Sequence, residues 1–155
     1  MTQHHPLHRL IYVSRFSAAF PKERQEQDYV TSAILRASLR NNGACGVTGL
    51  LLVHRGHFMQ VLEGQADAVK SIYERITQDR RHTDIRLITA RRCEQRLFPD
   101  WSLCVRRVCA GDGTFIGDVN IAGAADPSLL DADAALSVLI EARQARNRVL
   151  LAAMA

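Results

Sequence analysis

A polar amide inside a strongly apolar pair of predicted strands is the feature that most constrains this chain. Residues 47–64 contain two apolar runs separated by a short turn, and the uncharged amide of Gln60 lies within the second run. The turn at residues 54–56 ends in a glycine, which accommodates a tight reversal, so the pattern predicts a β-hairpin. A buried amide without partners costs about 1–3 kcal/mol. Gln60 therefore requires a polar partner, supplied either by the fold or by a ligand.

The segments before the hairpin predict one strand and one helix. Residues 8–14 alternate between two faces, so Tyr12 projects from the interior of a strand, on the same face as Leu10 and Ser14. Residues 23–40 carry apolar side chains at helical spacing. Asparagine and glycine tolerate the left-handed backbone that ends helices. We therefore expect this helix to stop at residues 41–43, which read Asn-Asn-Gly.

The segments after the hairpin predict a second helix over about residues 66–79, a fourth strand near 84–91 and a fifth near 101–108. The order strand, helix, strand, strand, helix, strand predicts an α+β ferredoxin-like βαββαβ sandwich with an added fifth strand. Residues 50–53 are apolar at every position, so both faces of that strand should be covered. We interpret the helical pattern over residues 128–154 as a C-terminal helical cap on the far face.

Composition limits the function classes. With 155 residues, 47% of them hydrophobic, the chain can fill the core of one compact domain. No stretch approaches the roughly 20 apolar residues that span a bilayer, and no apolar signal segment is present, so we expect a soluble cytoplasmic protein with no membrane partner. The four cysteines are scattered, without the spacing of a redox or zinc motif, so no metal site is expected.

The positive charge of the chain has an ordinary interpretation. The net charge is +4, and arginines are frequent between residues 75 and 107, where acidic residues interrupt them. There is no basic helix and no aromatic platform of the kind that single-strand binders use. We therefore expect a solvated face rather than a nucleic-acid partner, with one or two arginines available to a phosphate-bearing ligand.

Several polar and aromatic residues form an ordered series along the chain. They are Tyr12, Asn41 and Asn42, Gln60, Arg75 and Asp79, the run Arg80-Arg81-His82, and the run Arg96-Leu97-Phe98-Pro99-Asp100-Trp101. Each also has a structural interpretation, which we favour for any of them taken singly. The asparagines can be only a helix stop, the basic run only a solvated turn, and the tyrosine and tryptophan only core aromatics.

This series resembles the BLUF domain, the sensor of blue light using flavin adenine dinucleotide, over roughly residues 8–108. The most specific matches are Val47-Thr48-Gly49-Leu50-Leu51 leading to Phe58-Met59-Gln60-Val61-Leu62-Glu63-Gly64, then Asp79-Arg80-Arg81-His82, then the segment from Phe98 to Trp101. The resemblance implies a flavin ring between the two helices, with its polar edge toward the sheet. It divides the chain into a flavin-binding photosensor domain, residues 1–108, and a linker with a C-terminal helical extension, residues 109–155. FAD is the expected cofactor, with FMN or riboflavin as alternatives.

The matching residues have chemistry that suits a flavin. Asn42 offers a donor and an acceptor to the carbonyl and imide edge of the ring, and Ser38 and Asn41 lie around the same helix end. Arg75 and Asp79 are four residues apart and can pair while the guanidinium addresses a flavin carbonyl. The resemblance also implies that Arg81 and His82 reach the ribityl or phosphate portion. The implied cofactor-binding set is Tyr12, Ser38, Asn41, Asn42, Gln60, Arg75, Asp79, Arg81 and His82.

The resemblance also implies a mechanism. Blue light excites the flavin, Tyr12 transiently supplies an electron and a proton, and the Gln60 amide changes its orientation or tautomer as it bridges Tyr12 and the ring. The hydrogen bond at the flavin carbonyl is thereby strengthened, and no substrate bond is made or broken, which describes a switch rather than an enzyme. Trp101 and Leu103 are candidate relay residues. Leu103 stands where the family commonly has methionine, so an exchange between Trp101 and a sulfur-bearing side chain is not carried over.

Three functions stay open on the sequence. The first is a short stand-alone photoreceptor that signals through a downstream protein partner or as a homo-oligomer, since nothing after Val108 is long enough for an output enzyme. The second is a light-insensitive ferredoxin-like regulatory binding module, and the third is a small redox flavoenzyme. Flavin absorption separates the first two, and dark turnover of a reduced nicotinamide would favour the third.

Overall fold

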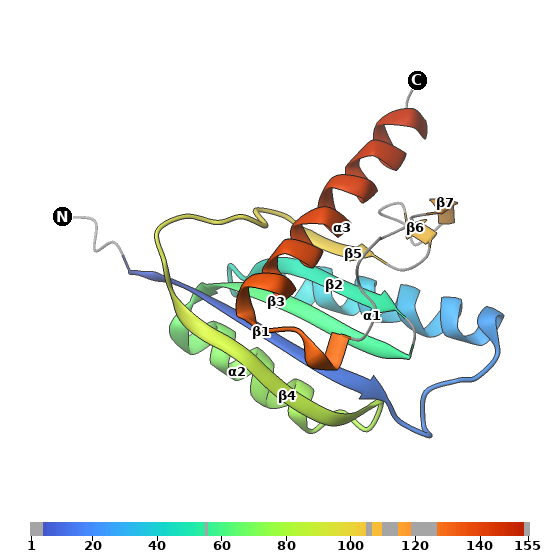
Figure 1. Cartoon of the computed structure of the whole chain (residues 1–155), viewed down its shortest axis with the longest axis horizontal. Coiled ribbons are helices and arrows are strands. Elements are labelled where there is room, and N and C mark those ends of the chain that lie inside the picture. The colour runs from blue at the N-terminus through green and yellow to red at the C-terminus, as the bar shows by residue number, and fades with distance from the viewer. Residues whose placement is uncertain (1–4, 55, 105–106, 110–114, 119–126, 154–155) are drawn as a thin grey trace.

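The predicted hairpin lies at the centre of a mixed β-sheet. The computed structural model describes residues 5–54, 56–104, 107–109, 115–118 and 127–153. Its elements are β1 (Leu7–Phe16), α1 (Arg24–Ala44), β2 (Thr48–His54), β3 (His57–Gln65), α2 (Ala66–Thr77), β4 (His82–Cys93), β5 (Trp101–Cys104), β6 (Arg107–Cys109), β7 (Phe115–Asp118), the 3-10 turn η1 (Pro127–Leu129) and α3 (Ala132–Ala153). Figure 1 shows α1 and α2 on one face of the sheet and α3 crossing the other.

The strand order confirms the predicted fold. The order is β4-β1-β3-β2-β5-β6-β7, and β1, β3 and their neighbours β4 and β2 pair antiparallel. Four strands in this order with two helices on one face form the ferredoxin-like sandwich. The added strand β5 lies beside β2 and runs parallel to it. The placement of Tyr12 and Gln60 depends on this layout, because β1 and β3 lie side by side.

Two short strands were not predicted. The fifth strand was expected to continue to Val108, but β5 ends at Cys104 and the antiparallel β6 follows. Strand β7 pairs with β6 inside the segment interpreted as a connection. These strands have only three and four residues. Such runs are too short for a period-2 pattern to stand out in the sequence.

The first helix ends later than expected. The predicted stop at residues 41–43 is wrong, because α1 continues to Ala44. The chain turns at Gly46, whose φ of 68° lies in the left-handed region, and the backbone N–H groups of Cys45 and Val47 both donate to the carbonyl oxygen of Asn42. Asn42 therefore belongs to the last helical turn.

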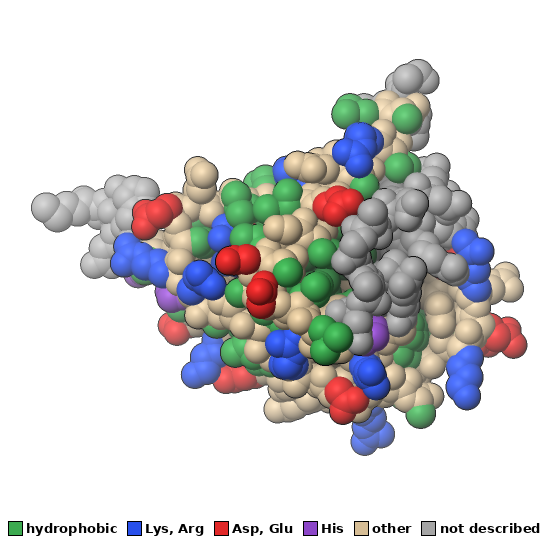
Figure 2. All heavy atoms as spheres, in the orientation of Figure 1, with side chains coloured by type: hydrophobic (Ala, Val, Ile, Leu, Met, Phe, Trp, Pro, Cys, Tyr) green, Lys and Arg blue, Asp and Glu red, His purple; other side chains and the backbone are tan. Residues whose placement is uncertain are grey.

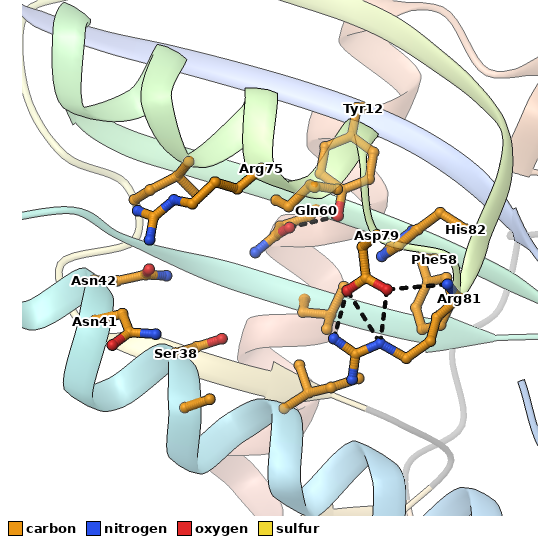
Figure 3. Close-up of a pocket in the computed structure, with 15 residues that line it drawn as sticks. Tyr12, Ser38, Asn41, Asn42, Phe58, Gln60, Arg75, Asp79, Arg81 and His82 are labelled. Atoms are coloured by element: carbon orange, nitrogen blue, oxygen red, sulfur yellow. Dashed lines mark hydrogen bonds and ion pairs between the residues drawn. The ribbon is translucent and has the colours of Figure 1, made fainter.

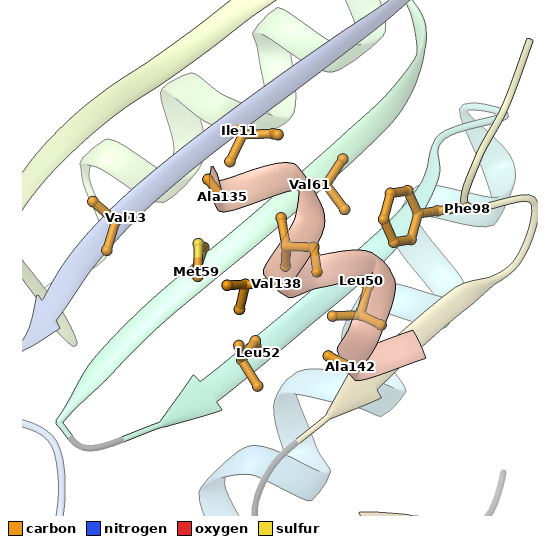
Figure 4. Packing of buried hydrophobic residues seen from close by; sticks show 11 residues of the cluster. Ile11, Val13, Leu50, Leu52, Met59, Val61, Phe98, Ala135, Val138 and Ala142 are labelled. Carbon is orange, nitrogen blue, oxygen red and sulfur yellow. The ribbon is translucent and has the colours of Figure 1, made fainter. Parts of the chain in front are cut away.

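Because side chains alternate between the two faces of each strand, the sheet has an apolar core on each face. On one face, Leu51 and Val53 pack with Phe20 and Phe58 beneath α1. On the other face, α3 covers a cluster that includes Ile11, Val13, Leu50, Leu52, Met59, Val61, Phe98, Ala135, Val138, Leu139 and Ala142. Figure 4 shows α3 lying over these side chains. The apolar run at residues 50–53 is thus covered on both faces, as predicted, and the C-terminal helix is the cover.

The surface does not carry a field of one sign on the side shown in Figure 2, where basic and acidic side chains are interspersed around α3. Within the described ranges, no helix is long and apolar enough to cross a membrane. The same part of the chain holds no group of three or more His, Cys, Asp or Glu side chains placed to bind a metal ion.

We expect Gly49→Ala to lower the free energy of unfolding by about 1–3 kcal/mol. A Cβ at Gly49 would overlap the carbonyl oxygen of Val61 on the neighbouring strand β3. The matched control is Gly43→Ala in α1, where a Cβ meets nothing within 4 Å. Alanine is favoured over glycine inside a helix by about 0.5–1 kcal/mol, so the control should gain stability. Urea unfolding of both variants measures the difference, and wild-type stability of Gly49→Ala would contradict the close approach.

Candidate functional site

A pocket of about 220 Å³ lies between α1, α2 and the sheet face that carries Tyr12. All nine residues of the cofactor-binding set predicted from the sequence line it, together with Ile34, Ala37, Leu51, Phe58, Ile72 and Ile76. Figure 3 shows the polar side chains converging on this space from both helices and from the strands. The structure therefore brings into one site residues that are up to 70 positions apart in the chain.

Tyr12 and Gln60 face each other across the β1–β3 ladder, where their Cα atoms are register partners. The Tyr12 hydroxyl donates a hydrogen bond of 2.5 Å to Gln60 Oε1, and the two residues are 1% and 5% exposed. Burial, followed by the charge of Asp79, raises the pKa of Tyr12 well above its ordinary value, so the phenol stays protonated and remains the donor. With its carbonyl held by Tyr12, Gln60 points its amide nitrogen into the pocket (Figure 3).

Asn42 presents a second amide to the same space. It lies in the last turn of α1, is 5% exposed, and its side chain has no hydrogen-bond partner in the described part of the chain. The amide nitrogen of Gln60 likewise has none among those residues. Both groups line the pocket with hydrogen-bonding capacity that the described residues leave unused, so both suit a ligand edge with donors and acceptors. The carbonyl and imide edge of a flavin has that chemistry, so the donor set fits this cofactor.

The ion pair at the pocket is not the one expected. Asp79 pairs with Arg81, with 2.5 Å between Oδ2 and the guanidinium, and also accepts the Arg81 backbone N–H. Burial by itself would raise the pKa of Asp79, but the hydrogen bonds and charge of Arg81 together hold it below its ordinary value. The expected pair with Arg75 is wrong because α2 ends at Thr77, so Asp79 lies outside the helix and helical spacing does not apply.

Arg75 lines the pocket without this ion pair. It lies in the last turn of α2, lines the pocket and makes no ion pair within the described ranges. Figure 3 shows it reaching from α2 toward Asn42 on α1. A guanidinium carries five donors in a planar fork, so Arg75 can address a carbonyl on a ring that lies between the helices.

His82 forms part of the inner wall. It begins β4, its Nδ1 lies 2.7 Å from Ser14 Oγ, and its ring centroid is 4.5 Å from that of Phe58. Burial, helped by the charge of Arg81 and opposed by that of Asp79, lowers the pKa of His82 to about 4. The imidazole is therefore neutral near pH 7. Arg81 and His82 both line the pocket, and their predicted contact with the ribityl or phosphate portion of a flavin stays a prediction.

We expect His82 to make stability depend on pH. Its pKa is about 4 in the folded protein and 6.5 in its ordinary state, so the unfolded chain binds the proton first as pH falls. Stability should therefore be lost from about pH 6.5 down to pH 4. The pKa of Asp79 lies below 3.8, so its loss of stabilisation comes at lower pH. Thermal unfolding across this range should show a shallower slope for His82→Gln than for the wild type, and equal slopes would contradict the assignment.

Sequence reasoning did not name the apolar walls of the pocket. Phe58 shares a strand face with Gln60, and Ile72 and Ile76 are four residues apart on α2. These spacings were visible, but they equally describe ordinary core positions. Only the placement of α1 and α2 over the same sheet face, with a space between them, distinguishes a cavity wall from a filled core.

The candidate relay residues stay predictions. The backbones of Trp101 and Leu103 belong to β5 and pair with Gly49 and Leu51 of β2. Leu51 lines the pocket, so Leu103 is the register partner of a pocket residue. The side chains of Trp101 and Leu103 lie outside the described residues.

Comparison with known proteins identifies a family and several light-responsive relatives. Residues 7–104 match BLUF, described as sensors of blue-light using FAD. Photoactivated adenylate cyclase subunit beta of Euglena gracilis is 40% identical over 95 residues, which cover 61% of this chain and 10% of the relative. The blue light- and temperature-regulated antirepressor BluF of Escherichia coli K12 is 38% identical over 76 residues, which cover 49% of this chain and 17% of the relative. This chain thus spans about a tenth of the length of the photoactivated cyclase subunit.

Solved structures agree with these relatives. The dark-state structure of BlrB, a BLUF protein, superposes with a TM-score of 0.65 at 28% identity and covers 96% of this chain and 97% of that one. A bacterial light-regulated adenylyl cyclase gives a TM-score of 0.55 at 32% identity over 64% of this chain and 27% of that one. The family match covers β1 to β5, the strands and helices that build the pocket. This chain therefore belongs to the BLUF family, the sensors of blue light that use FAD.

Proposed function

We propose that the pocket between α1 and α2 holds FAD and that the Tyr12–Gln60 hydrogen bond is the element that light changes. The observation that carries this proposal is the arrangement of Gln60. Its carbonyl accepts from the buried phenol of Tyr12, and its amide nitrogen opens onto the pocket that Asn42 shares. One side chain thus connects an oxidisable aromatic residue with the ligand space.

Three residues supply the polar contacts in this proposal. The Asn42 and Gln60 amides address the carbonyl and imide edge, and Arg75 addresses a carbonyl from α2. The cavity of about 220 Å³ is smaller than the ~300–1,000 Å³ typical of ligand pockets. We infer that it takes the ring and that the adenosine portion of FAD lies outside. FMN and riboflavin should then bind with affinity similar to that of FAD.

A bound flavin supplies absorption of blue light and, when excited, an acceptor for one electron. Tyr12 holds its hydroxyl proton in a hydrogen bond to Gln60 Oε1, so the proton can leave along an existing bond as the electron leaves the ring. The amide of Gln60 carries both a donor and an acceptor. A half-turn of the amide exchanges Oε1 with Nε2, and an imidic tautomer redistributes donor and acceptor without rotation. Either change alters hydrogen bonding at the pocket without moving a charge.

Output is proposed to pass through residues 109–155, the extension beyond the sensor residues 1–108. In support, α3 packs directly on the sheet face behind the Tyr12–Gln60 pair. Its C-terminal end extends beyond the edge of the sheet in Figure 1 and carries Leu151, which is 68% exposed, so this end is accessible to a protein partner or a second copy of the chain. The relatives include proteins named as photoactivated cyclases and an antirepressor, but the partner of this chain is not carried over from them.

Absorption spectroscopy tests the proposal. The purified full chain, supplied with FAD, should absorb blue light and show a red shift after illumination that reverses in the dark. Riboflavin in place of FAD should give the same shift if the pocket recognises only the ring. A protein without flavin absorption after supply of FAD would favour the light-insensitive binding module. Steady oxidation of a reduced nicotinamide in the dark would favour the redox enzyme.

A further inference from the structure

A buried carboxylate lies on the opposite face of the strand that carries Gln60. Glu63 follows Gln60 by three residues on β3 and is fully buried, at 0% exposed. On the same β1–β3 ladder, Tyr12 is the register partner of Gln60, and Arg9 is the register partner of Glu63. Because neighbours alternate along a strand, the first pair faces the pocket and the second faces the layer of α3. The two pairs share one pair of strands.

Glu63 fastens the segment between β4 and β5 to this ladder. Its Oε1 accepts the backbone N–H of Phe98 at 2.6 Å, and its Oε2 accepts that of Leu97 at 3.1 Å. Oε2 also receives the guanidinium of Arg9, with Nε at 2.8 Å. Hydrogen bonds to a carboxylate are stronger than neutral ones, and a buried carboxylate that loses its donors is strongly destabilising. The segment cannot easily separate from β3.

Arg96 adds a second attachment from the same segment. Its guanidinium donates to Thr48 Oγ1 at 2.7 Å, to the backbone oxygen of Glu63 at 2.8 Å and to that of Gly46 at 2.8 Å. It thereby joins β3 to the start of β2. We use the name clamp for Arg9, Glu63 and Arg96 together.

The fastened segment continues into the outer layer. Phe98 is 1% exposed and belongs to the apolar cluster beneath α3, beside Leu50 and Val61 (Figure 4). Two residues later, the backbone oxygen of Asp100 accepts the N–H of Gly49, and β5 begins at Trp101. The clamp therefore connects the strand of Gln60 both with the core under α3 and with the start of β5.

We propose that the clamp is a set of positioning residues that passes a change at Gln60 to α3. This inference rests on the proposed function, because it needs light to alter the hydrogen bonds of Gln60. A displacement of β3 cannot leave the segment of residues 96–98 behind, since its charge-assisted bonds to Glu63 are buried. Phe98 then moves against α3. The clamp does not touch the pocket, and none of its three residues lines it.

The test uses the full chain loaded with flavin and compares hydrogen exchange of α3 amides in the light and in the dark. We examine Glu63→Gln, which keeps the shape and removes the charge, and Arg96→Lys, which keeps the charge and removes the fork. The controls are Glu74→Gln, an exposed carboxylate on α2, and Arg91→Lys, an exposed guanidinium on β4. Both clamp variants should keep the red shift, while the light-to-dark difference in α3 exchange rates falls by about fivefold or more. The two control variants should keep the red shift and the light-to-dark difference in α3 exchange rates.

The possible outcomes separate failure of the clamp inference from failure of the proposed function. A clamp variant with the wild-type red shift and the wild-type exchange difference in α3 overturns the inference and leaves the proposed function intact. A wild-type protein whose red shift is accompanied by no exchange difference in α3 also overturns the inference alone. Absence of the red shift in the wild type overturns the proposed function, and the inference with it. If Glu63→Gln fails to fold, Arg96→Lys decides, because it leaves the pair of Arg9 and Glu63 in place.

Discussion

Replacing Tyr12 with phenylalanine is expected to leave FAD bound and to abolish the light-induced red shift. The variant keeps the buried ring that packs with Leu10, Leu62 and Val69, so the pocket should retain its shape. It loses the hydroxyl that donates to Gln60 Oε1, and with it the proton that accompanies electron loss. The fold should lose only about 0.5–1.5 kcal/mol, the net value of one hydrogen bond. Difference absorption spectra before and after blue illumination give the amplitude of the shift.

Tyr73→Phe is the matched control for this experiment. The ring of Tyr73 lies 5.6 Å from that of Tyr12, on α2, and its hydroxyl has no hydrogen-bond partner among the described residues. Its removal should therefore leave the shift unchanged. Gln60→Leu should behave like Tyr12→Phe, because leucine fills a similar volume but offers neither donor nor acceptor. A full red shift in Tyr12→Phe would contradict the role assigned to the phenol.

Leu139→Ala is expected to have the largest effect on stability, a loss of about 2–5 kcal/mol in the free energy of unfolding. Leu139 lies on α3, is 0% exposed and packs in the cluster that covers the sheet. Truncating it removes apolar contacts and leaves a cavity at the interface between the helix and the strands. Because α3 and the sheet share this core, the loss should appear in the unfolding of the whole protein.

Leu151→Ala, on the same helix, is the matched control. Leu151 is 68% exposed, and surface substitutions of this kind usually change stability by no more than about 0.5 kcal/mol. Urea unfolding followed by circular dichroism measures both variants. A Leu139→Ala protein as stable as the wild type would mean that α3 does not share the core of the sheet. That result would also remove the structural route from Phe98 to α3.

The local patterns that the structure confirms are the long ones. The hairpin of β2 and β3 was predicted from two apolar runs around a glycine turn. The stripe of α2 and the alternation of β1 are periodic over elements of twelve and ten residues. Their residues face the sides that the periods predicted, including Tyr12 toward the helices and Ile11 toward α3. Backbone geometry alone imposes these periods, so they can be detected without any knowledge of neighbouring segments.

Contacts at helix ends and between short segments could not be predicted from such periods. Asp79 pairs with Arg81 and not with Arg75, because α2 ends at Thr77, two residues before the end that the helical spacing predicted. The end of α1 depended on Gly46 and on bonds to a single carbonyl oxygen. Such choices involve differences of about 1 kcal/mol between competing partners, which local residue preferences do not resolve.

The amino-acid sequence by itself determined the order of the first five strands and of the three α-helices, the burial of Gln60 in an apolar hairpin and, through the ordered match of its motifs, the family and the candidate pocket residues. Tertiary structure alone decided which groups meet. Gln60 finds Tyr12 48 residues away, and Glu63 finds the backbone of Phe98 35 residues away. The physical reason is that periodicity reports how each segment presents its faces, whereas the partner of a buried polar group depends on where distant segments pack. Only that packing gave Gln60 a phenol on one side and an open cavity on the other.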